Sequence, residues 1–233
     1  MDMADMYRHV PGYFHSVSER VSNILDVIGY SQERRKGKVM AATTTDVFTN
    51  IPKCFELEGT CFQYIFGSRR DGSTGPGLDS DQDILFWDSN KQLVTELADC
   101  QPDKHNFLMV HDGQTHPGYV KLQLLGMLPD NTPEPVFHYQ NRCFRVDSYD
   151  RTVLSNQISR ILSPDEVYSG PARRSLNDTK EACVDNVHGI RCARWPNEAH
   201  EWFQRQRPQG WPDSHHLQNA RKNICFAVGV GHP

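Results

Sequence analysis

Residues 61–68 read Cys-Phe-Gln-Tyr-Ile-Phe-Gly-Ser, and residues 79–86 read Asp-Ser-Asp-Gln-Asp-Ile-Leu-Phe. The first stretch is rich in aromatic and β-branched residues, which predicts a strand over 61–66 that runs into Gly67 and Ser68. Residues 82–87 predict a second strand. A loop rich in glycine and aspartate, residues 69–80, is expected between them. These two strands and the acidic residues at the start of the second decide the predicted fold.

The acidic start of the second strand is the sharpest local feature of the sequence. Side chains alternate along a strand, so Asp81 and Asp83 face the same way. Carboxylates held that close repel each other and call for a compensating cation. Their oxygens suit Mg²⁺ or Mn²⁺, which prefer oxygen ligands. The alternative for an isolated Asp-x-Asp pattern is an acidic loop end exposed to water.

Two other motifs are excluded at this place. A calcium-binding EF-hand loop from Asp79 needs glycine after Asp83, where Ile84 stands. A phosphate-binding P-loop from Gly67 needs lysine where Ser73 stands, and without it the terminal phosphates lose their cation.

The combination of Gly67-Ser68 with Asp81 and Asp83 favours phosphoryl or nucleotidyl transfer. Gly67 lets a backbone N–H approach a phosphate closely, and Ser68 offers amide and hydroxyl donors at a turn or helix start. Catalysis of that kind is mainly positioning and charge neutralisation by two metal ions. A third carboxylate is then needed to hold the ion that activates the attacking hydroxyl.

Outside these two strands, the sequence predicts further strands and helices. This mixture indicates an α/β or α+β core around a central mixed sheet. One long N-terminal helix is expected over 13–28, from apolar residues at helical spacing. Further elements are predicted in chain order: strands 107–110 and 119–124, a helix 152–162, an extended segment 182–192, and helices 197–207 and 215–223.

Composition narrows the class of protein. The chain has 233 residues, with 25 Lys and Arg against 29 Asp and Glu, a net charge of −4. That balance argues against a protein that coats nucleic acid with positive charge. The seven cysteines form no Cys-x-x-Cys pair, so no structural zinc is predicted and a reducing compartment is expected. No apolar run reaches membrane-span length and the first residues are acidic, so no membrane partner is expected. We expect a cytoplasmic protein, with a nuclear location also open.

Motifs further along the chain carry a resemblance to a known family. Gly67-Ser68 with Asp81-Gln82-Asp83 resembles the polymerase-β-like nucleotidyltransferases. The downstream motifs resemble the Mab-twenty-one family, which includes cyclic GMP-AMP synthase (cGAS) and the cGAS-like receptors. These motifs are Gly170-Pro171-Ala172, Asp185-Asn186-Val187, Trp195-Pro196-Asn197-Glu198, Arg205-Gln206-Arg207 and Gly210-Trp211-Pro212. The resemblance spans roughly residues 17–232.

The resemblance implies an enzyme that makes a cyclic dinucleotide second messenger from ATP and GTP in innate immune signalling. It implies an N-terminal helical segment, 1–50, and a catalytic nucleotidyltransferase core, 51–233. Two Mg²⁺ or Mn²⁺ ions would be held by Asp81, Asp83 and Asp185, and the donor nucleotide by Gly67 and Ser68 with the two aspartates of the motif. Double-stranded RNA or DNA would be the activator.

Several positions keep more than one interpretation. The resemblance implies that the third carboxylate lies on a strand shortly before the first Trp-Pro, which favours Asp185, with Asp178 and Glu181 as rivals. Arg69 and Arg70 are candidate phosphate contacts or solvated arginines. A helical lobe expected of the family is missing, which predicts a truncated catalytic lobe. The alternative function is a catalytically silent Mab-twenty-one-like protein that serves as a nucleotide-binding or interaction module.

Two further sets of side chains are expected to have no part in the site. Trp195, Trp202 and Trp211 are expected to pack structurally rather than stack on bases, since each lies at a helix boundary or on a helical apolar face. The adjacent His215 and His216 are expected to be solvated.

Overall fold

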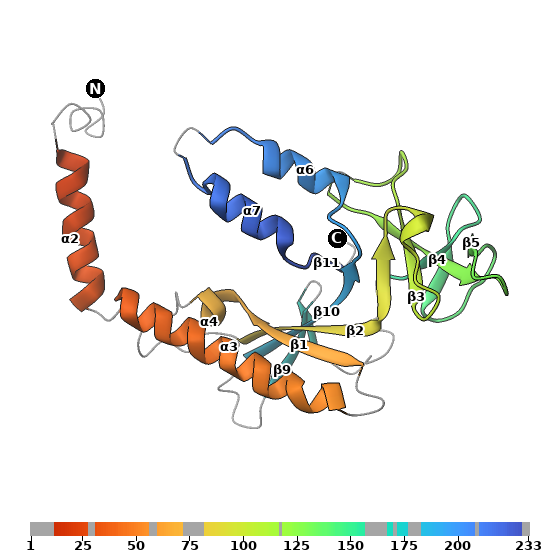
Figure 1. Cartoon of the computed structure of the whole chain (residues 1–233), viewed down its shortest axis with the longest axis horizontal. Helices are drawn as coiled ribbons and strands as arrows, with labels where there is room; N and C mark the ends of the chain where they lie inside the picture. Colours follow the sequence, from red (N-terminus) through yellow and green to blue (C-terminus); the bar gives the residue numbers. More distant parts are fainter. Residues whose placement is uncertain are drawn as a thin grey trace.

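The computed structural model shows a mixed α/β fold built on one curled, mixed sheet with few helices (Figure 1). This confirms the α+β class. The residues that it describes are 12–27, 31–55, 60–71, 82–116, 118–156, 167–169, 172–176, 183–207 and 210–229.

The strands are β1 (Cys61–Phe66), β2 (Gln82–Val94), β3 (His105–Val110), β4 (Lys121–Met127), β5 (Pro133–Pro135), β6 (Phe144–Val146), β7 (Thr152–Leu154), β8 (Val167–Ser169), β9 (Ala172–Leu176), β10 (Cys183–Cys192) and β11 (Phe226–Val228). The α-helices are α2 (Tyr13–Val27), α3 (Gln32–Phe55), α4 (Gly67–Asp71), α6 (Asn197–Gln204) and α7 (Ser214–Lys222), and Leu97–Asp99 forms a 3₁₀ turn.

Strand β2 is the centre of the sheet. The main strand order is β6-β7-β4-β3-β2-β10-β9-β8, with β1 also paired to β2 and β11 to β10. The β2–β10 and β2–β3 pairs are parallel, and the other pairs are antiparallel. Parallel strands are buried more fully than antiparallel ones, which agrees with the burial of Gln92, Leu93 and Val94 where β2 pairs with β3.

An irregularity divides β2 into two halves. Trp87 lies opposite Gly189, whereas Gln92 lies opposite Arg191, so the intervening β2 residues bulge out of register. In this bulge the Asp88 carboxylate accepts the Asn90 amide at 3.0 Å and pairs with Lys91 Nζ at 3.1 Å. The first half of β2 pairs with β1 and the second half with β3.

The second half of β2 carries the core. Leu93, Phe107 and Cys192 are buried against one another, from β2, β3 and β10. Val94 and the polar Asn106 are fully buried. Asn106 is satisfied there, because its Oδ1 accepts from Gln92 Nε2 at 2.9 Å and its Nδ2 donates to two carbonyls. Burial of polar groups is tolerated only with such partners.

Helix α3 closes the free edge of β1, beside which it lies in Figure 1. The Asn50 side chain donates to the Gln63 carbonyl at 2.6 Å and accepts the Gln63 amide at 2.9 Å. One helical turn earlier, Asp46 Oδ1 accepts the Ile65 amide at 2.9 Å. Two helix side chains thus take the place of a neighbouring strand and satisfy backbone groups that an edge would expose.

Most predicted elements are confirmed, and three expectations need correction. Residues 152–154 form strand β7 instead of the start of a helix, because they pair with β6; residues 157–162 lie outside the described ranges. Residues 69–71 belong to helix α4 instead of a loop. Within the described residues, two helices, α2 and α3, precede β1 where one long helix was expected. Among the described helices, none has the length and apolar character needed to cross a membrane.

Candidate functional site

Asp83 and Asp185 lie directly opposite each other at the start of two neighbouring parallel strands. Their Cα atoms are partners in the β2–β10 register. Neighbouring strands are about 4.8 Å apart and opposed residues point to the same face, so the two carboxylates share one face of the sheet. Two acids in this arrangement repel each other unless a cation lies near them. The structure therefore brings together two of the three predicted catalytic aspartates.

Gly67 lies against the Asp83 carboxylate. It follows the last residue of β1, Phe66, which is paired with Asp83. Its φ of +66° is in the left-handed region, and a Cβ built on it would lie 1.9 Å from Asp83 Oδ2. Any side chain here would collide with the carboxylate, so glycine is required both by the backbone and by the close approach of Asp83. Ser68, half-buried, is the second residue of α4.

Helix α4 is held in place by α3 through a buried carboxylate. Asp46 is 5% exposed, and its Oδ2 accepts from Arg70 Nη1 at 2.6 Å while Oδ1 holds β1. Arg70, one of the two candidate phosphate contacts, is thus engaged in a structural ion pair. Arg69, the other, has its Nη1 3.4 Å from Gln82 Oε1 and is exposed.

A cation of the chain lies beside Asp185. Arg174 on β9 is its partner in the antiparallel β9–β10 register, and Arg174 Nε lies 3.5 Å from Asp185 Oδ1. Both atoms are buried, and neither has a hydrogen-bond partner among the described residues. The pair is therefore a charge contact without the directional bonding that would fix it. Asp83, Asp185 and Arg174 form a row across β2, β10 and β9.

These residues fit a divalent metal ion. Asp185 Oδ1 is a buried anionic oxygen with no hydrogen-bond partner in the described part of the chain, and a second carboxylate faces the same side of the sheet. Oxygen ligands of this charge are those that Mg²⁺ and Mn²⁺ prefer. Asp81 lies outside the described residues, as do the rivals Asp178 and Glu181.

The expected packing is confirmed for Trp195 and Trp202 but not for Trp211. Trp195 meets Phe203 edge-on at 5.2 Å and donates from Nε1 to the Asn223 carbonyl at 3.2 Å, which ties α6 to the end of α7. Trp202 is 43% exposed but also meets Phe203 edge-on, at 5.0 Å. Trp211 is 78% exposed, so the expectation that it packs was wrong. It precedes the N-terminus of α7 and does not lie on its apolar face.

A second group with metal-ligand chemistry contains His215 and His216, whose expected exposure to solvent is confirmed. Asp213, His215 and His216 have ligand atoms within 4.8 Å of one another and are exposed. Asp213 caps α7 by accepting the His216 amide at 2.9 Å, and His216 Nδ1 is 2.7 Å from the same oxygen. The capping pattern accounts for this group, because the Asp213 oxygen is already used by the helix.

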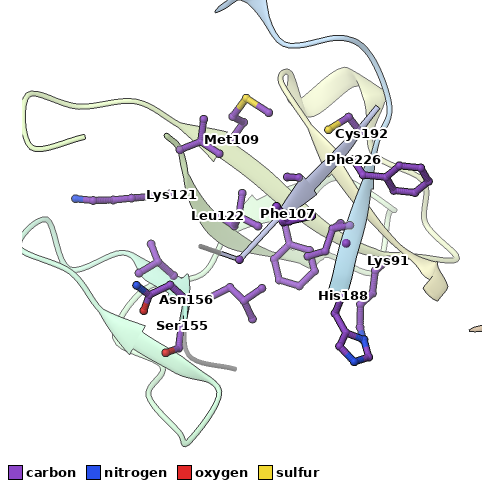
Figure 2. Close-up of a pocket in the computed structure, with 18 of the residues that line it drawn as sticks. Lys91, Phe107, Met109, Lys121, Leu122, Ser155, Asn156, His188, Cys192 and Phe226 are labelled. Carbon is purple, nitrogen blue, oxygen red and sulfur yellow. The ribbon is translucent and has the colours of Figure 1, made fainter. Parts of the chain in front are cut away.

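A large cavity of about 1470 Å³ lies elsewhere in the curled sheet (Figure 2). Its lining includes Phe107, Leu122 and Phe226, with His188 at its lower end in the view and Lys91 beside it. Burial, with the charges of Arg173 and Lys91, lowers the pKa of His188, which favours the neutral imidazole. His188 is three residues from Asp185 and so faces the other side of β10. The lining includes none of the described site residues, so the cavity is separate from the carboxylate pair.

Comparison with known proteins adds no family assignment. Neither a protein-family model nor a curated protein matches the chain. Function is therefore argued from the geometry of the site.

Proposed function

We propose that this chain is a nucleotidyltransferase of the cGAS-like, Mab-twenty-one type, which joins ATP and GTP into a cyclic dinucleotide for innate immune signalling. The observation that supports this most is the register of Asp83 with Asp185 across two parallel strands, with Gly67 against Asp83. Acid pairs also occur at solvent-exposed loop ends, but a pair beside a Gly-Ser helix start matches what transfer to a nucleoside triphosphate requires.

The chemistry follows from charge and position. Divalent ions bound here would neutralise the triphosphate and activate the attacking hydroxyl. Asp83 and Asp185, with Asp81, would hold these ions. Gly67 lets the donor phosphates approach the backbone closely, and Ser68 offers hydrogen-bond donors to them. A hydroxyl of the second nucleotide would attack the α-phosphorus of the first, with loss of its proton to solvent and release of pyrophosphate, and a second transfer of the same kind would close the ring. The nucleotidyltransferase fold and two-ion catalysis belong to this proposal.

The test is a product assay on the full chain. Labelled ATP and GTP are incubated with Mn²⁺, alone and with double-stranded RNA or DNA, and the products are separated. We expect a cyclic product that Asp83→Asn and Asp185→Asn each reduce at least about 100-fold, because each removes a charge needed in the transition state. Asp150→Asn is the matched control, since the Asp150 side chain is 70% exposed.

The alternative is a catalytically silent protein that retains the fold for binding. No product under any of these conditions would favour that alternative and reject the proposed enzyme. A product that persists in both Asp83→Asn and Asp185→Asn would reject the residue assignment. The location of the protein, cytoplasmic or nuclear, is part of the proposal and is tested by microscopy of the tagged chain.

A further inference from the structure

We propose that Arg174 is a resident counter-ion of Asp185, and that it disfavours divalent-ion binding until a triphosphate enters the site. This inference rests on the proposed function. It makes metal binding depend on nucleotide binding, and it gives a role to a residue outside every sequence motif of the site.

The backbone register places Arg174 beside the acid pair. It lies directly across β9–β10 from Asp185, which in turn lies directly across from Asp83. Opposed residues in a sheet share a face, so the guanidinium and the two carboxylates are on the same side. The strand register therefore places the positive charge of Arg174 next to the acid pair.

The contact between Arg174 and Asp185 is loose. The Nε–Oδ1 separation of 3.5 Å is within the range of an ion pair, but within the described ranges neither atom is hydrogen-bonded. Strong Asp–Arg pairs are frequently bidentate, with short, aligned bonds. The Arg174 side chain is 39% exposed, whereas that of Asp185 is 17% exposed, so the guanidinium has room to turn away from its partner. A loose pair of this kind compensates the charge of Asp185 without occupying all of its lone pairs.

The positive charge of Arg174 should weaken the binding of a divalent ion at Asp185. A divalent ion at Asp185 would be repelled by the guanidinium, and a +2 and a +1 charge about 5 Å apart in a water-like medium cost on the order of tenfold in affinity. A triphosphate removes this penalty because its negative charge attracts the ion and Arg174 together. By linkage, the metal then strengthens nucleotide binding by the same factor.

The chain supplies a matched control. Arg173 precedes Arg174 and lies opposite Asn186, so it is on the other face of the sheet. Removing its charge leaves the acid pair unchanged. Arg174→Lys keeps the positive charge at the site and separates the role of charge from that of side-chain shape.

The experiment measures free Mn²⁺ by electron paramagnetic resonance during titration of the full chain, with and without a non-hydrolysable ATP analogue. Without nucleotide, Arg174→Gln should lower the Kd for Mn²⁺ about tenfold, whereas Arg174→Lys and Arg173→Gln should stay within about twofold of the unaltered chain. With the analogue, the advantage of Arg174→Gln should disappear.

The outcomes separate the two proposals. If Mn²⁺ binds and Asp185→Asn abolishes binding, but Arg174→Gln leaves the nucleotide-free affinity unchanged or weaker, the counter-ion role is overturned and the metal site stands. The counter-ion role is also overturned if Arg173→Gln has the same effect as Arg174→Gln. If neither the unaltered chain nor Arg174→Gln binds Mn²⁺, with or without the analogue, the proposed function is overturned together with this inference.

Discussion

Substitution of Gly67 by alanine tests the geometry of the site most directly. Two costs are expected. The φ of +66° places an L-residue in the left-handed region, at about 1 kcal/mol relative to glycine. The new Cβ would also lie 1.9 Å from Asp83 Oδ2, a contact that only a shift of the carboxylate or of β1 can relieve. Overpacking of this kind costs about 1–3 kcal/mol, which gives a total of about 2–4 kcal/mol.

Gly210 provides the control for the backbone cost alone. Its φ is +71°, but a Cβ built on it has nothing within 4 Å. Gly210→Ala should therefore lose only about 1 kcal/mol of unfolding free energy. The assay is urea denaturation of both variants, with Mn²⁺ affinity measured on the folded protein. Because Asp83 must move, Gly67→Ala should also weaken Mn²⁺ binding, whereas Gly210→Ala should not. Equal stability of the two variants with unchanged metal affinity would refute this reasoning.

Two further predictions concern ion pairs away from the acid pair. Asp46→Ala leaves the Arg70 guanidinium and the Ile65 amide without their acceptor, so the unfolding free energy should fall by about 2–3 kcal/mol in urea titration, and a loss under about 0.5 kcal/mol would contradict the bracing role. Hydrogen bonds from Lys121 and Arg151 hold the pKa of Asp112 well below its ordinary 3.8, so its stabilisation is present above that value and is lost as the pH falls. Asp112→Asn should therefore flatten the decline of unfolding free energy below about pH 4, as followed by circular dichroism, and an unchanged decline would exclude this carboxylate as its source.

The strands that carry the site could be predicted from the sequence, but their pairing could not. Residues 61–66 and 82–87 have the composition and the boundaries of strands, and β1 and the first half of β2 occupy those ranges. The register of Asp83 with Asp185 depends on a parallel pair between strands far apart in the chain. Local patterns contain no information about such a pair. Asp185 was singled out only through the family resemblance, and its role remains a prediction.

The incorrect expectations have tertiary causes. Apolar residues at helical spacing predicted a helix from Thr152, but Thr152 is buried and pairs with Val146 in β6. Packing overrides local spacing when a short segment can complete a sheet. The role of Asp46 was missed because a single aspartate in a helix has no local pattern. The bracing role of Asp46 depends on its contacts with β1 and Arg70, which only the folded structure brings beside it.

The parallel pairing of β2 with β10 also sets when the site can come into existence. About one hundred residues separate Asp83 from Asp185, so their approach is among the least local events in the folding of this chain. During synthesis the ribosome releases β1, α4 and β2 long before β10. Until β10 has been synthesised, the Asp83 carboxylate has no Asp185 across from it, so a partly made chain cannot assemble the acid pair. The acid pair therefore forms only after β10 has been made and has paired with β2.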